Sequence, residues 1–357
     1  MTTLGPGRNE REHNIPKLAI PSSAMADIGV LDILRCSGGN IGFGSQSCCA
    51  QNLLPTVIND TQIRVSAFDH IKALKVKCGG PLPWTEISKG VHIGGEHFFL
   101  SGRARGIFRP RQMRRGVLSI KSTEPRVGRM RRYDDIASNE GFFEYRFMGD
   151  NPEAPDNRWL REAWKDQSPF IYFHGIIPSV YDPIFPVFVS EWIPERGTVR
   201  VVVGEIDRTG AITSPITEDL RRYRVIETKA RLHQTIFRET VLAAYDRRCA
   251  ISAMPVERFL EAAHILADRD ERGLPVVSNG ISMSVLHHTA FDANLMGIDP
   301  DGKIHINRDL LEIVDGPTLQ YALQNLDGEK IKQPARQDYR PNKDFLAERF
   351  EQFKTAA

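Results

Sequence analysis

Four polar residues in the C-terminal third have types and spacings that could do chemistry together: His264, Asn279, His288 and Asp292. His288 and Asp292 are four residues apart, so on a helix both side chains leave the same face and can reach one ion. An imidazole and a carboxylate suit Mg²⁺, Mn²⁺ or Zn²⁺. A neutral His264 beside that ion could take a proton from a water that attacks a phosphodiester. The alternative is an ordinary hairpin and helix with unrelated polar side chains.

The elements that must position these residues follow from the surrounding pattern. The runs CAIS and LEAAHI and the turn-rich LADRDERGLPVVSNG predict a hairpin with a long loop. The run ISMSVLHHTAFDANL predicts a strand end that continues into a helix, with His264 facing the start of that helix. Upstream, residues 219–249 keep helical apolar spacing without Pro or Gly, which predicts a long helix leading into the hairpin.

Several of these motifs, in this order, closely resemble the HNH endonuclease family: RLHQTIFRETVLAAYDRRCAIS, LEAAHI, SNGISM, HHTAFD and GIDPDGKIHIN. The resemblance covers about residues 231–310 and implies a ββα-metal hairpin and helix. By it, His264 is the general base, and Asn279 braces the loop and orients that base. His288 binds the metal and the scissile phosphate, and Asp292 is a further ligand candidate. The implied cofactor is a divalent metal, Mg²⁺ or Mn²⁺, with Zn²⁺ and Ni²⁺ as alternatives.

Two positions near these motifs need separate treatment. His287 competes with His288, but His288 has the family's spacing to the following Phe and Asp. Many family members place an Asp or His directly before the base as a metal ligand, and this chain has Ala263 there. Glu261 is the candidate replacement only if the strand is irregular, because strict alternation points it away from His264.

A strongly basic block lies further upstream. Residues 103–132 contain eleven Lys or Arg and a single acid. Interleaved with apolar residues, such a block can line a groove that follows a phosphate backbone, and a solvated face is the alternative. Arg109, Arg111, Arg114 and Arg115 are the expected phosphate contacts, which position a duplex without specifying its sequence.

The basic block lies in a β-rich segment, residues 67–205. Apolar runs at 116–122, 141–149, 169–176, 183–193 and 198–206 predict strands of a compact β domain or barrel, and 156–167 predicts a short amphipathic helix. The motifs YDDIASNEGFFEY, MGDN, NRWLREAWKDQSPFIYFHG and YDPIFPVFVSEW resemble the SRA domain, a PUA-like β-barrel that flips modified cytosine out of DNA.

The SRA resemblance implies a pocket for an extruded base. Tyr133 and Tyr145 would stack on the base, and Asp135 or Asp134 would contact its Watson-Crick edge. The alternative is that both tyrosines simply pack the barrel.

Composition sets the wider limits. The chain has 357 residues, 41% apolar residues and a net charge of +2, which is ordinary for a protein with two globular domains. Five cysteines without a C-x-x-C pair predict neither a disulfide framework nor a thiolate zinc site. No apolar stretch could span a membrane and no secretion signal is evident, so we expect a cytoplasmic protein.

The predicted fold class is α+β, a PUA/SRA-like β-barrel domain followed by a ββα-metal HNH nuclease domain. The expected divisions are a disordered or poorly ordered extension at 1–62, the SRA-like domain at 67–205, a linker at 206–219, the nuclease at 220–320 and a helical tail at 321–357. The tail is expected to pack on the nuclease or to join a partner.

Together these patterns predict a modification-dependent, type IV-like restriction endonuclease. It would recognise 5-methylcytosine or 5-hydroxymethylcytosine in duplex DNA by base flipping and cut with a one-metal site. A double-strand break needs two such sites, so a homodimer on DNA is expected. One alternative keeps the nuclease but has a PUA-like domain that reads another modified base or grips DNA without selectivity. Another is a modified-DNA binding protein whose HNH unit is inactive.

Overall fold

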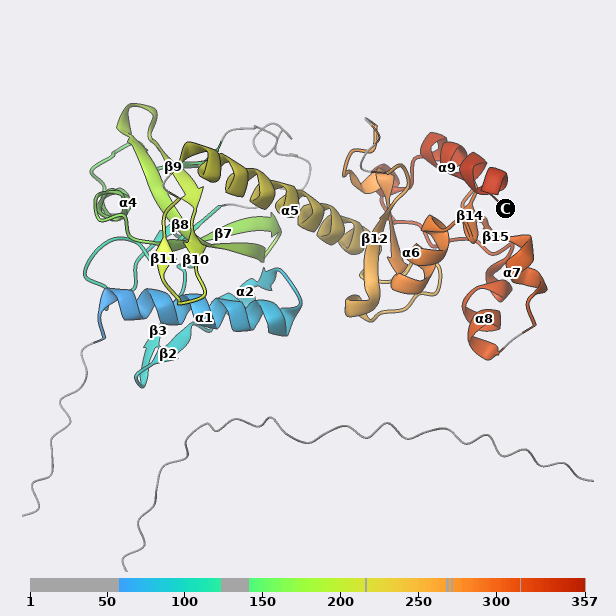
Figure 1. Cartoon of the computed structure of the whole chain (residues 1–357), viewed down its shortest axis with the longest axis horizontal. Coiled ribbons are helices and arrows are strands. Elements are labelled where there is room, and N and C mark those ends of the chain that lie inside the picture. Colours follow the sequence, from blue (N-terminus) through green and yellow to red (C-terminus); the bar gives the residue numbers. More distant parts are fainter. Residues whose placement is uncertain are drawn as a thin grey trace, which may run out of the picture. The chain divides into compact units, whose positions relative to one another are not determined.

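The computed structural model describes residues 58–122, 141–215, 217–267, 270, 272–314 and 316–356 (Figure 1). Most of the predicted N-terminal extension lies outside these residues, as do Tyr133, Asp134 and Asp135. The described elements combine helices with mostly antiparallel sheets, which agrees with the predicted α+β class.

The first described element is a helix that the sequence pattern did not predict, α1 (Asp60–Cys78). Asn59 and Gln62 form a reciprocal capping box at its start, and Gly79 ends it in the left-handed conformation. Its buried residues recur at helical spacing, Ile63, Ala67, Phe68, Ile71 and Leu74. The β-rich segment predicted at 67–205 therefore begins inside a helix, and no strand was predicted over 67–78; the apolar period of α1 was the available signal for the helix.

A curled half-barrel sheet forms the core of the N-terminal region. Its strands are β1 (Leu82–Pro83), β4 (Ile107–Phe108), β5 (Ser119–Lys121), β6 (Phe143–Arg146), β7 (Phe170–Ile177), β8 (Val180–Ile193) and β9 (Thr198–Val203). The strand order is β4-β5-β7-β8-β9-β6, with β1 paired to β8. Only β5 and β7 run parallel. Within the described residues the end strands β4 and β6 do not pair, so the sheet is a half-barrel where a barrel was predicted.

Shorter elements surround this sheet. They are α2 (Trp84–Ile87), β2 (Val91–Ile93), β3 (Glu96–Phe98), α4 (Pro155–Lys165), β10 (Glu205–Ile206) and β11 (Ile212–Thr213). The amphipathic helix expected at 156–167 is α4, which buries Leu160 and Ala163 in the core of the sheet. The predicted strand runs coincide with β5 to β9 and β10, because each combines apolar alternation with flanking turn residues.

A long helix, α5 (Glu218–Ala244), contributes to two hydrophobic cores. Val225 and Leu232 belong to the first core, which is built on the half-barrel sheet. Phe237 and Val241 belong to a second cluster, formed by the C-terminal elements. The helix begins with a Thr217 side-chain cap and has no internal Pro or Gly, as its sequence predicted.

The C-terminal region is built on small hairpins and short helices. It contains β12 (Leu260–His264), β13 (Gly280–Ser284), α6 (Val285–Asp292), β14 (Met296–Ile298), β15 (Ile304–Ile306), α7 (Arg308–Glu312), α8 (Pro317–Ala322) and α9 (Lys343–Ala356). The pairs β12–β13 and β14–β15 are antiparallel. The C-terminal helix α9 packs on β14, with Leu346 in the second core, so the tail packs on the other C-terminal elements.

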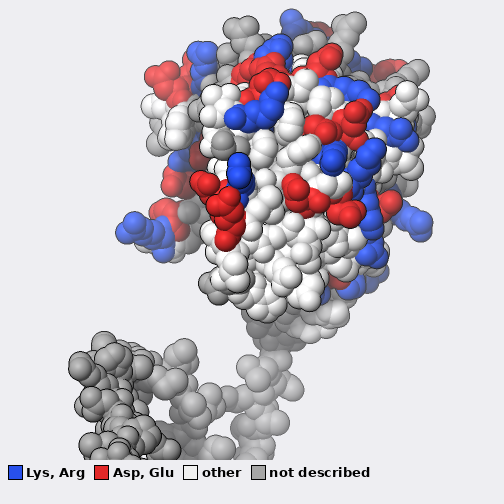
Figure 2. Space-filling view, turned by 90° about the vertical axis from the view of Figure 1, so that its right-hand side faces the viewer, with Lys and Arg blue, Asp and Glu red and all other residues white. Residues whose placement is uncertain are grey.

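Helix length, surface charge and exposed apolar side chains complete the description. None of the described helices is both long and apolar enough to cross a membrane. The face of the molecule in Figure 2 intersperses acidic and basic residues over its upper part and is mostly uncharged below. Large apolar side chains exposed in the C-terminal region include Leu286, Ile313, Val314 and Tyr321.

Candidate active site

Asn279 holds together the two ends of the loop between β12 and β13. The residue is fully buried, and its side-chain oxygen accepts a hydrogen bond of 2.9 Å from the Leu266 amide. Its amide group donates to the carbonyls of Leu266 and Leu274, each at 3.1 Å. Three hydrogen bonds to one buried side chain, two of them fully buried, fix the loop directly after His264.

The glycine that follows Asn279 is explained by close packing. Gly280 pairs across the hairpin with His264, under the helix α5. A Cβ atom added at Gly280 would lie 2.5 Å from Val241 Cγ2 and 2.8 Å from Phe237 Cζ. Only glycine therefore lets α5 approach the hairpin this closely.

His264 is the last residue of β12, and its ring stacks on Phe237 of α5. The ring centroids are 3.9 Å apart and the planes are inclined by 17°. Phe237 itself is buried in the second core, so it forms a fixed surface for the imidazole. The β12–β13 register is unbroken, so His264 leaves the strand on the face opposite Glu261.

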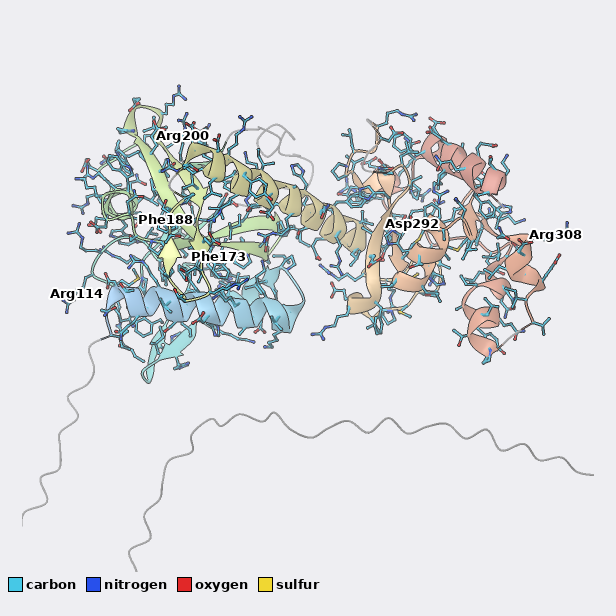
Figure 3. The ribbon with its side chains drawn as sticks, in the orientation of Figure 1. Arg114, Phe173, Phe188, Arg200, Asp292 and Arg308 are labelled. Atoms are coloured by element: carbon cyan, nitrogen blue, oxygen red, sulfur yellow. The ribbon has the colours of Figure 1, made fainter. Side chains whose placement is uncertain are left out.

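His288 and Asp292 lie together on α6, as their spacing predicted (Figure 3 labels Asp292). His288 Nε2 and Asp292 Oδ2 are 3.2 Å apart. The other ring nitrogen, Nδ1, is 2.6 Å from Glu261 Oε2 of β12. His288 is 22% exposed, whereas Glu261 and Asp292 are 47% and 63% exposed. The site is thus open to solvent on its carboxylate side.

The position of Glu261 corrects the strand argument made from the sequence. Glu261 pairs with Met283 and Ala263 pairs with Ile281 in a regular strand, so Glu261 and Ala263 share one face. Alternation does point Glu261 away from His264, and that same alternation turns it toward α6 and His288. No irregularity of the strand is needed for Glu261 to reach the site.

The His288–Asp292 pair fits a divalent metal. Ligand distances of about 2.1 Å place two neighbouring octahedral donors about 3 Å apart, close to the separation of this pair. No group of three or more His, Cys, Asp or Glu side chains forms a complete metal site among the residues described. Two protein donors would leave the other coordination positions to water and phosphate oxygens, as is usual for Mg²⁺.

His287, the alternative to His288, is buried and engaged elsewhere. Its Nε2 donates to the carbonyl of Ala322 at 2.9 Å, and its Nδ1 lies 2.8 Å from Ser284 Oγ and 3.3 Å from Cys249 Sγ. Burial acts to raise the pKa of Cys249, but hydrogen bonds from His287, Ser252 and backbone amides outweigh it and lower that pKa to about 6. This network anchors the start of α6 and leaves His288 as the exposed member of the pair.

The segment that carries this geometry matches a known family. Residues 249–299 match the family model described as HNH endonuclease. These residues form an HNH endonuclease domain. The HNH assignment implies a nuclease that hydrolyses phosphodiester bonds, with DNA as its substrate and a divalent metal as its usual cofactor.

Comparisons with solved structures and with curated proteins give no further assignment. Among solved structures, the chain is similar to a protein described as a modification-dependent TagI restriction endonuclease. The identity is 15%, the match covers 76% of this chain and 91% of the other, and the TM-score is 0.26. A TM-score this low marks a loose superposition, and we infer neither fold nor function from it. Comparison with curated proteins found no match.

Outside the HNH domain, one residue of the expected base pocket is described. Tyr145 lies on β6 and is 9% exposed within the core of the half-barrel. Its hydroxyl donates to the Lys121 carbonyl at 3.2 Å, and its ring lies edge-on to Tyr172. Burial raises the pKa of Tyr145 above its ordinary range. Stacking on an extruded base would require this ring to leave its packing.

The four expected phosphate-binding arginines fall into two kinds. Arg109 lies over the Trp159 ring, 4.6 Å from its centroid, and pairs with Glu162 at 3.0 Å. Arg115 makes a bidentate pair with Asp166, at 2.9 and 3.1 Å. Arg111 and Arg114 are exposed, and Figure 3 shows Arg114 projecting from the surface.

Two contacts of the candidate site were not expected from the sequence. Glu261 was a candidate ligand only for an irregular strand, and its place two residues before Ala263 was the available signal for its contact with His288. Phe237 was read as part of an apolar helix face, and a stacking partner on a separate element leaves no local signal in the sequence. Both contacts depend on tertiary packing.

Proposed function

We propose that this chain is a modification-dependent, type IV-like restriction endonuclease that cuts duplex DNA containing 5-methylcytosine or 5-hydroxymethylcytosine. The observation that carries the cleavage half is the donor pair His288 Nε2 and Asp292 Oδ2, 3.2 Å apart on α6 beside the catalytic hairpin. Such a pair can bind a divalent cation next to a phosphodiester.

In the proposed reaction each residue has one task. His264, at the end of β12 and backed by Phe237, accepts a proton from the attacking water. Asn279 keeps the loop after His264 in place, so the base meets the water in a fixed orientation. His288 and Asp292 hold the ion, which when bound stabilises negative charge on the phosphate oxygens. Mg²⁺ or Mn²⁺ suits this donor set, and Zn²⁺ or Ni²⁺ is the alternative.

The selectivity half rests on the resemblance of the N-terminal region to SRA domains. Two tyrosines and a carboxylate are the residue types that can stack on a flipped base and accept a hydrogen bond from its exocyclic amine. In the proposal Tyr133 and Tyr145 stack on the base, and Asp134 or Asp135 reads its edge. The exposed Arg111 and Arg114 contact phosphates.

One observation favours a second candidate. Tyr145 is buried and hydrogen-bonded, so it could stack on a flipped base only by leaving its packing. This favours a half-barrel that reads another modified base or grips DNA without selectivity. The nuclease assignment is the same in both candidates. In either case one HNH site cuts one strand, so a double-strand break calls for two chains on the DNA, and we propose a homodimer.

The test is cleavage of matched duplexes that are unmodified or carry 5-methylcytosine or 5-hydroxymethylcytosine, with Mg²⁺ or Mn²⁺. Wild type should cut only modified duplexes, and His264→Ala should bind them without cutting. A control, His305→Ala, removes a histidine outside the proposed catalytic set and should retain cleavage. Equal cleavage of all three duplexes would support the non-selective candidate. Binding without cleavage under either metal would leave a DNA-binding protein with an inactive HNH unit.

A further inference from the structure

The three polar side chains around α6 do not converge on one point. Glu261 and Asp292 lie at different nitrogens of the same imidazole, Glu261 at Nδ1 and Asp292 at Nε2 of His288. The Nδ1 to Oε2 distance is 2.6 Å, that of a direct charge-assisted hydrogen bond. Two ligands of one ion would be about 3 Å apart, so this contact leaves no place for a metal between them.

A carboxylate can only accept a hydrogen bond, which places the ring proton on Nδ1 of His288. Nε2 lies on the side of Asp292, and when a metal is bound its lone pair would face the ion there. Histidines that bind metals usually donate their other ring N–H to a carboxylate or a carbonyl, which fixes the ring and its tautomer. The contact between Glu261 and His288 has this form.

From this geometry we propose that Glu261 is a positioning residue, which holds the His288 ring so that Nε2 and Asp292 together receive the metal. The inference rests on the proposed function, because it assigns the ion to that site. Glu261 and Ala263 lie on the same face of β12, and Ala263 has no side-chain donor for a metal. The proposed role is therefore carried out from this face by Glu261. Glu261 reaches α6 from two residues earlier and acts through the histidine, without binding the ion itself.

The packing supports a fixed position for this contact. Cys249, Ser284 and the Ala322 carbonyl hold His287 on the buried side of α6. His288, one residue further on, is thereby turned to the strand face that carries Glu261. The His288 ring could still rotate about its side-chain bonds, and the contact with Glu261 restricts this rotation.

The experiment measures Mn²⁺ binding to the full chain without DNA, by calorimetry and by the electron paramagnetic resonance signal of free Mn²⁺. Asp292→Asn and His288→Ala should abolish measurable binding. Glu261→Gln should weaken it by about 10-fold to 100-fold, as expected for loss of an orienting carboxylate. Glu312→Gln removes the same charge from an exposed position on α7 and should leave the affinity unchanged.

A second readout separates positioning from direct ligation. Nitrogen-15 chemical shifts of the His288 ring should report a proton on Nδ1 in the wild type and mixed tautomers in Glu261→Gln. Unchanged Mn²⁺ affinity in Glu261→Gln would overturn the inference while leaving the metal site intact. Complete loss of binding in Glu261→Gln, equal to that in Asp292→Asn, would make Glu261 a ligand and overturn it too. If the wild type itself binds no Mn²⁺ at millimolar concentration, the metal site of the proposed function fails as well.

Discussion

Phe237 and His264 stack with their ring centroids 3.9 Å apart, although one belongs to a helix and the other to the strand that ends at the active site. The phenyl ring is buried, and the imidazole rests on it at an angle of 17° between the planes. A general base is effective only when its orientation is fixed before the reaction. For His264 as the proposed general base, Phe237 would supply this constraint from outside the residues that match the HNH family.

Replacing Phe237 with Leu should therefore reduce the cleavage rate. The substitution retains part of the core volume but removes the flat surface under His264, so kcat should fall on the order of 10-fold to 100-fold. KM for DNA should change little, because no DNA contact is removed. Single-turnover cleavage at several DNA concentrations separates the two parameters.

Val241→Ala is the matched control on the same helix. Val241 is fully buried in the same core, so shortening it to Ala should lower the free energy of unfolding by about 2 kcal/mol. A fall in kcat as large as that of Phe237→Leu would show that loss of packing alone accounts for the effect.

Asn279→Ala should destabilise the HNH domain. It leaves the Leu266 amide and the carbonyls of Leu266 and Leu274 without their partner, and buried unsatisfied groups cost about 1–3 kcal/mol each. We expect a loss of at least about 2 kcal/mol in the free energy of unfolding, measured by urea titration. Asn307→Ala, which removes only the N-cap of α7, should cost about 1 kcal/mol. Equal losses in the two variants would contradict the bracing role of Asn279.

Much of this site could be predicted from local sequence. The four-residue spacing of His288 and Asp292 is a property of one helix, and the Asn-Gly pair lies at the end of one hairpin strand. The contacts of Glu261 and Phe237 could not be predicted in this way, because each joins elements separated in sequence. Among the described residues the end strands of the half-barrel do not pair, which the sequence could not indicate for the same reason: strand runs indicate strands, but closure depends on whether distant end strands pair.

The basic block should contain both DNA-binding and structural arginines. Arg111→Gln and Arg114→Gln should each weaken DNA binding and reduce the slope of log K against log salt by about 1, because each loses one phosphate contact. Arg109→Gln should instead lower the melting temperature, since Arg109 pairs with Glu162 and lies over Trp159. Fluorescence anisotropy at several salt concentrations and thermal unfolding measure the two effects. An unchanged salt slope in both Arg111→Gln and Arg114→Gln would rule out phosphate contacts at these positions.

The helix α9 should be required for a stable active site. Arg349 of α9 donates hydrogen bonds to the Phe291 carbonyl and to Asn294 at the end of α6, and its guanidinium lies over the Phe291 ring. Arg349→Met keeps much of the apolar stem but removes these bonds, so the free energy of unfolding should fall by about 2 kcal/mol. Lys354→Met on the same helix is exposed and should change it by less than about 0.5 kcal/mol. Equal melting temperatures of the two variants would contradict this role.

The continuity of α5 has a consequence for how the protein opens. Leu232 lies in the core of the half-barrel and Phe237 in the core of the HNH domain, five residues further on and thus about 7.5 Å along the helix axis. Backbone amides in this turn should therefore be sheltered from hydrogen exchange as long as either core is intact. Local opening of one region would then meet resistance from the other, so the half-barrel and the HNH domain should share one cooperative unit along α5.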